Sequence, residues 1–68
     1  MQGIQTINAD YYCLQSKPSG PISVLTTNSY VVGHYDEKTG GMSWHRVVLA
    51  TQRAHIENWL QRHFPPKG

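Results

Sequence analysis

The segment 36–41 constrains the fold of this chain most, because it separates two runs of strand-forming residues. It reads Asp-Glu-Lys-Thr-Gly-Gly. An aspartate can fold its side chain back onto the backbone, and a glycine readily takes the positive φ that a hairpin turn needs. The flanking runs 30–35 and 42–49 are rich in β-branched and aromatic residues, which favour strands. The sequence therefore predicts a β-hairpin whose return strand is 42–49.

Two further strands are predicted before this hairpin. The segment 10–15 is strand-compatible, and 22–27 is rich in β-branched residues. The segment 16–21 between them holds two prolines and a glycine, which mark a break. Asn28 and Ser29 suggest a bend or a bulge, and Gly33 inside a strand suggests a bulge or a tight bend.

The segment 51–63 is predicted to be a helix with Thr51 as its N-cap. Ile56, Trp59, Leu60 and Phe64 recur at helical spacing and form one apolar stripe, so we expect Trp59 and Phe64 in the core. Two prolines stop the helix, and 65–68 is expected to be a loose tail. These elements predict an α+β fold, a small antiparallel sheet of three to four strands with one C-terminal helix.

The length and the cysteine content predict a single small domain. A chain of 68 residues has only a marginal core. Cys13 is the only cysteine, so no intrachain disulfide can form, and we expect it to be a small buried residue. A single thiol fits a reducing cytoplasm. No secretory signal and no apolar run of about 20 residues is present, so no membrane association is expected.

The charge and the titratable residues bear on the class of function. The formal net charge is +2, and its excess lies late in the chain, from Arg46 onward. Such a modest basic region suits an anionic partner. The four histidines lack metal-site spacing, and the four carboxylates form no evident acid–base pair. We therefore expect no metal, no cofactor and no enzymatic activity.

Aromatic and basic residues gather on the predicted hairpin. Proteins that bind single strands combine cations with aromatic rings on which bases stack. Trp44 fits a core position and an exposed stacking position about equally. Trp44 and Arg46 are predicted to share one face of the return strand, which slightly favours the exposed position. The nucleic-acid-binding candidates are Tyr30, His34, Tyr35, Lys38, Trp44, Arg46 and Arg53.

The run Trp44-His45-Arg46-Val47-Val48-Leu49 follows a Thr-Gly turn and precedes a helix. In this respect residues 18–68 resemble bacterial single-stranded DNA-binding proteins. The resemblance implies an OB-fold, a small Greek-key barrel that binds oligonucleotides across its strands. It also implies that Trp44 stacks on bases, that Arg46 is the motif arginine and that His45 lies at a subunit interface. Tyr35 or His34 falls near a second aromatic position of the family.

The sequence departs from that family in three ways. Ala50 stands where the family has a stacking phenylalanine, and the hairpin tip is shorter and less basic. The family continues after the helix into at least two more strands and an acidic tail. A barrel without those strands has open edges, so the expected fold is a truncated OB-like β-β-β-α domain that pairs as a dimer.

Three functions follow as alternatives. The leading one is non-catalytic binding of single-stranded nucleic acid, with DNA favoured over RNA. The second is a protein-interaction module, an accessory factor related to phages, plasmids or replication that keeps the fold without binding DNA. The third is sequence-specific binding of duplex DNA, which the few basic residues on the strands disfavour.

Overall fold

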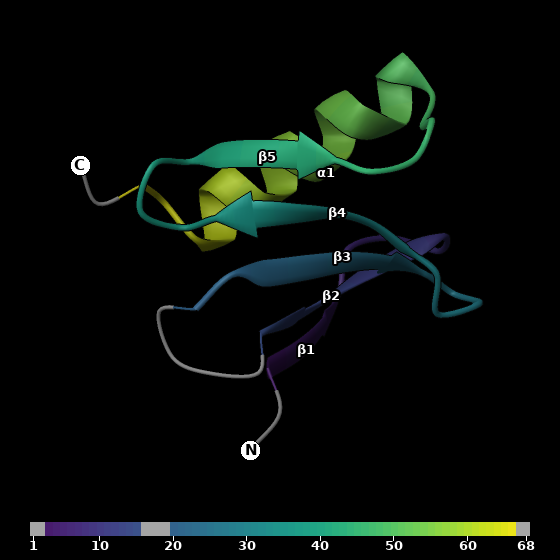
Figure 1. The fold of residues 1–68 in the computed structure, drawn as a ribbon, viewed down its shortest axis with the longest axis horizontal. Coiled ribbons are helices and arrows are strands. Elements are labelled where there is room, and N and C mark those ends of the chain that lie inside the picture. The colour runs from purple at the N-terminus through teal and green to yellow at the C-terminus, as the bar shows by residue number, and fades with distance from the viewer. Residues whose placement is uncertain (1–2, 16–19, 67–68) are drawn as a thin grey trace.

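The computed structural model describes residues 3–15 and 20–66 of the chain. Residues 16–19 of the predicted break and residues 67–68 of the predicted tail lie outside this range. The described residues form five strands and one helix (Figure 1): β1 Gly3–Thr6, β2 Tyr11–Gln15, β3 Ile22–Thr26, β4 Val31–Asp36, β5 Gly41–Trp44 and α1 Ala50–His63.

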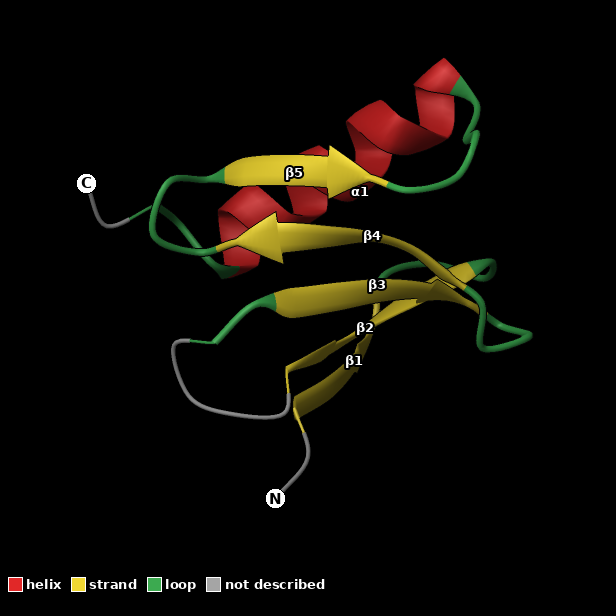
Figure 2. Ribbon diagram, viewed as in Figure 1, coloured by secondary structure: helices red, strands yellow, loops and turns green. Residues whose placement is uncertain are grey.

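The five strands form one antiparallel sheet in the order β1-β2-β3-β4-β5. Figure 2 shows this sheet as a twisted layer, with α1 behind β4 and β5. The predicted α+β class and C-terminal helix are confirmed, and the number of strands is slightly higher than predicted. Each described strand pairs with its neighbour in the sequence. A Greek-key barrel, as the resemblance implies, would instead bring non-consecutive strands together.

The predicted strands agree with β2, β3 and β4 to within a residue, but the return strand is much shorter than 42–49. The ladder continues past β5 only through the His45 amide, which donates to the Val32 carbonyl at 2.8 Å. The following segment leads to the helix, with Val47 and Leu49 exposed and Val48 buried. β1 was not predicted, because its four residues hold one apolar side chain and form a strand by pairing with β2.

The predicted turn is confirmed in detail. The Gly40 amide donates to the Asp36 carbonyl at 2.8 Å, and Gly40 has a φ of 75°. The Asp36 carboxylate accepts from the Lys38 amide at 2.9 Å. Ser29, at the predicted bend before β4, has a φ of 70°.

The predicted irregularity at Gly33 is also present. Val24 faces Gly33 and Leu25 faces Val31, so Val32 is the extra residue of a bulge in β4. A Cβ at Gly33 would lie 2.5 Å from the Ser43 carbonyl oxygen of β5. The hairpin is therefore tight enough here that only glycine fits.

The core lies between one face of the sheet and α1. Ile56 and Leu60 of the helix are fully buried against residues from three strands and two connections: Ile7, Cys13, Ile22, Val24, Val32, Tyr35 and Val48. Trp59 and Phe64 are half-buried and pack against this core. The expected burial of Cys13 is confirmed.

The start of the helix differs from the prediction. The helix begins at Ala50 with Leu49 in the N-cap position, and no side chain caps it. Thr51 therefore lies inside the first turn. In the last turn, Arg62 and His63 place basic groups where the helix dipole favours them. In the described part of the chain, no helix is long and apolar enough to cross a membrane.

Candidate functional site

Two exposed histidines meet on the β4–β5 hairpin. His34 pairs with Ser43, so His45, two residues further on, is its diagonal neighbour. The His34 Nδ1 and His45 Nε2 atoms are 2.7 Å apart, and the rings meet edge to face at 71°. The ladder bond from the His45 amide to Val32 fixes the backbone that brings the rings together. His45 was predicted at an oligomer interface, and that role stays a prediction.

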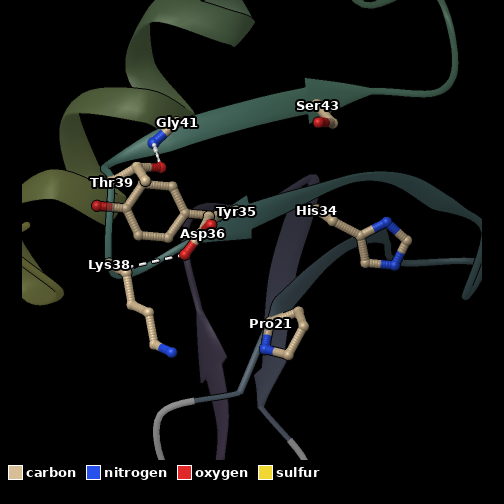
Figure 3. A pocket seen from close by; sticks show the side chains of 8 residues that line it. All are labelled: Pro21, His34, Tyr35, Asp36, Lys38, Thr39, Gly41 and Ser43. Atoms are coloured by element: carbon tan, nitrogen blue, oxygen red, sulfur yellow. Dashed lines mark hydrogen bonds between the residues drawn. The ribbon is translucent and has the colours of Figure 1, made fainter.

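The hairpin carries a shallow hollow next to its turn, which we call the turn hollow (Figure 3). It is lined by Pro21, His34, Tyr35, Asp36, Lys38, Thr39, Gly41 and Ser43. In Figure 3, His34 and Tyr35 leave β4 in different directions, and the Lys38 side chain extends from the turn. Lys38 and Asp36 are both exposed. The cation of this hollow therefore has a carboxylate close by, which weakens its attraction for an anion.

A second hollow lies where the chain passes from β5 to α1. We call it the arginine hollow, and it is lined by Trp44, His45, Arg46, Val47, Val48 and Arg53. Arg46 follows the end of β5, and Arg53 lies in the first turns of α1. Both arginines are exposed, and no carboxylate is among the lining residues, although the Glu57 carboxylate accepts from the Trp44 indole at 2.9 Å. The arginine hollow has two arginines near one carboxylate, and the turn hollow has one lysine near Asp36, so the arginine hollow is the more electropositive of the two. The His34–His45 contact joins them.

An exposed aromatic ring lies beside the arginine hollow. The Tyr30 side chain is 57% exposed, and the Arg46 guanidinium carbon lies 5.4 Å from the centre of its ring. This distance is typical of a cation–π contact. The prediction placed Arg46 on the face of Trp44 by strand alternation. Because β5 ends at Trp44, this alternation does not extend to Arg46. Arg46 is instead paired with Tyr30.

The structure corrects the predicted role of Tyr35. Its side chain is 1% exposed, and its hydroxyl donates to the Phe64 carbonyl at 2.7 Å. Burial raises the pKa of Tyr35, and the nearby charges of Glu37 and Asp36 raise it further. The ring lies on the face of the sheet that α1 covers. It therefore offers no free surface on which a base can stack.

Trp44 is half-buried, where the prediction required an exposed ring. It pairs with Gly33, packs against the core and donates its indole N–H to the Glu57 carboxylate of α1 at 2.9 Å. Only its uncovered part lines the arginine hollow. The contact with Glu57 gives Trp44 a structural role, because it ties β5 to the helix.

The predicted residues thus separate into two groups. Tyr30, Arg46, Arg53 and His45 lie at the arginine hollow, whereas His34 and Lys38 lie at the turn hollow. No protein-family model matches this chain, and neither a curated protein nor a solved structure matches it.

Proposed function

We propose that this protein binds single-stranded nucleic acid, DNA in preference to RNA, along the β4–β5 hairpin and without catalysis. The observation that carries the proposal is the arrangement of Tyr30, Arg46 and Arg53. Two exposed guanidinium groups line one hollow that has no carboxylate in its wall, and an exposed ring lies beside it.

The chemistry of a single strand suits this arrangement. Arg46 and Arg53 would contact phosphates, since a guanidinium donates paired hydrogen bonds that match phosphate oxygens. Tyr30 would stack on a base, and such a stack contributes about 1–3 kcal/mol for any base. His34, His45 and Lys38 would continue the path toward the hairpin turn.

The proposal is tested by fluorescence anisotropy with a labelled oligo-dT at low and moderate salt. We expect binding at low salt that weakens in Tyr30→Ala, by about tenfold if one stack is lost. Arg46→Gln and Arg53→Gln should each weaken binding as well. Unlabelled duplex DNA and oligo-U serve as competitors, and both should compete poorly.

Arg62→Gln is the matched control, because Arg62 is an exposed arginine at the other end of α1. It removes the same charge and should leave affinity nearly unchanged. Absence of binding by the wild-type protein at low salt would contradict the proposal. An equal loss in Arg62→Gln would show that binding does not involve the arginine hollow.

A second candidate function is a protein-interaction module. It is favoured by the segment between β5 and α1, where Val47 is fully exposed and Leu49 is 74% exposed. Two solvent-exposed apolar side chains next to the start of a helix can contact an apolar surface of a partner protein. This function predicts a complex that depends little on salt and that Val47→Ser with Leu49→Ser disrupts.

A further inference from the structure

The facing nitrogens of His34 and His45 form an arrangement that the proposed function does not explain. Both side chains are exposed, and both come from backbone positions fixed by the β4–β5 ladder. The His34 Nδ1 and His45 Nε2 atoms are 2.7 Å apart, and the ring centres are 4.8 Å apart. Two ring nitrogens therefore face each other across a hydrogen bond at the surface.

We propose that His34 and His45 form a two-histidine chelate for a divalent late transition metal such as Zn²⁺. Imidazole nitrogens bind Zn²⁺ at about 2.0–2.1 Å, which places two ligands of a tetrahedral site about 3.3 Å apart. To admit the ion, the two nitrogens separate by roughly 0.6 Å, and each ring turns by about 35° so that its lone pair points at the ion and not at the facing nitrogen. Both side chains are exposed, so rotations about their own side-chain bonds can supply this movement.

Metal binding leaves the number of protons on the two histidines unchanged. One imidazole now donates its N–H to the lone pair of the other. A metal needs a lone pair on both facing nitrogens, so the donor ring moves its proton to its remote nitrogen. The remote nitrogens, Nε2 of His34 and Nδ1 of His45, belong to exposed side chains that water can reach. Two neutral imidazoles therefore bind the ion with no net release of protons.

Two histidines supply only part of a coordination shell. No group of three or more His, Cys, Asp or Glu side chains is arranged for a metal within residues 3–15 and 20–66. Asp36, two residues beyond His34 on β4, uses its carboxylate to accept from the Lys38 amide. Water or a small external donor fills the other positions, which makes the site open and exchangeable. Nitrogen ligands rank Zn²⁺, Ni²⁺ and Cu²⁺ far above Mg²⁺.

The experiment uses the full chain without a histidine tag. Isothermal titration calorimetry with Zn²⁺ should give one ion per chain, and Mg²⁺ should give no heat of binding. His34→Gln and His45→Gln should each weaken Zn²⁺ binding by more than about tenfold, because each removes one of two protein ligands. Both side chains are exposed, so circular dichroism should show an unchanged fold.

His55→Gln and His63→Gln are matched controls, because both histidines are exposed on α1 and line a separate hollow with Asn58, Trp59 and Arg62. Neither should change the affinity. Imidazole ¹⁵N resonances provide a second readout, and those of His34 and His45 alone should move when Zn²⁺ is added. The proposal is overturned if the double variant His34→Gln/His45→Gln binds Zn²⁺ as tightly as the wild type. It is also overturned if all four histidines respond equally.

The metal site does not depend on the nucleic-acid interface, although the two share His34 and His45. Loss of oligo-dT binding in Tyr30→Ala with intact Zn²⁺ binding would separate them.

Discussion

Cys13 shows how one buried residue sets a response to pH. Its side chain on β2 is 1% exposed, and this burial raises the pKa of the thiol from 9.0 to about 11, against a smaller lowering by a backbone hydrogen bond from Gln5. The neutral thiol is the form that the core accepts, because a thiolate there would be desolvated. A cysteine in this setting is a packing residue and a poor nucleophile.

The free energy of unfolding is expected to fall as the pH rises from 9.0 to about 11. The folded pKa exceeds the unfolded one, so the stabilisation is complete below about pH 9 and is lost toward pH 11. The raised pKa of Tyr35 acts in the same direction. Urea unfolding at a series of pH values between 7 and 11 measures the decrease.

Cys13→Ala is the comparison for this titration. It should lower stability at every pH, because it removes a buried sulfur, and it should flatten the decrease above pH 9. The decrease that remains belongs to Tyr35 and other groups. A decline as steep as that of the wild type would show that the thiol does not contribute.

Sequence patterns located most of the candidate residues but not their environments. Alternation along a strand says which side chains share a face, but not which face a helix will cover. Tyr35 and Trp44 were therefore assigned to an exposed surface, whereas α1 covers the first and half-covers the second. The contact of Arg46 with Tyr30 joins a residue just before β4 to one just after β5, and strand alternation does not predict a contact between residues outside the strands.

Among the elements, the β4–β5 hairpin is the most tightly specified. A Cβ added at Gly33 would meet the Ser43 carbonyl oxygen at 2.5 Å and the Met42 methyl at 2.6 Å. A flexible methionine can move aside, but a backbone carbonyl in a ladder cannot. The hairpin therefore depends on the absence of a side chain at this position.

Gly33→Ala is expected to destabilise the protein by about 1–3 kcal/mol, because the strands must separate to admit the methyl group. Thermal unfolding measures the loss. Gly41→Ala is the control, since its Cβ would meet only the Thr39 hydroxyl, at 3.2 Å, and that side chain can turn away. Equal effects of the two substitutions would refute the role of the Ser43 carbonyl.

The elements themselves were predictable to different degrees. The helix was found because its apolar stripe repeats at helical spacing, and its start differs by one residue from the prediction. The sequence-based prediction missed β1 and made the return strand too long for the same reason. A strand begins and ends where a partner supplies hydrogen bonds, and the partners here are β2 for β1 and Val32 for His45. Local residue preference does not contain that information.

At the scale of the whole molecule, the distribution of charge matters more than the net value of +2. Three cations lie on the proposed path: Lys38 at the turn hollow, and Arg46 and Arg53 at the arginine hollow. The remaining cations of the sequence are Lys17, Arg62 and Lys67. Of these three, the structure describes only Arg62, in the last turn of α1. A single strand bound along the hairpin would release counterions from the three cations of the path.

The association constant for oligo-dT should therefore decrease as the salt concentration rises. In a plot of the two logarithms the expected slope is about −2, because each of three phosphate contacts contributes about −0.7. Anisotropy titrations at several salt concentrations give this slope. A value near −4 would mean that all six cations contribute, which points to diffuse attraction by the entire surface and not to a defined path.

The order of the elements has a consequence for how the molecule reaches its native state. Each strand pairs with the next along the chain, so the sheet can grow one hairpin at a time from local contacts, which are quick to form. The helix that covers the apolar face comes after all five strands. During synthesis from the N-terminus, the sheet therefore emerges before its cover. Until α1 docks, the side chains that it buries, Ile22 and Tyr35 among them, stand open to water and to other nascent chains.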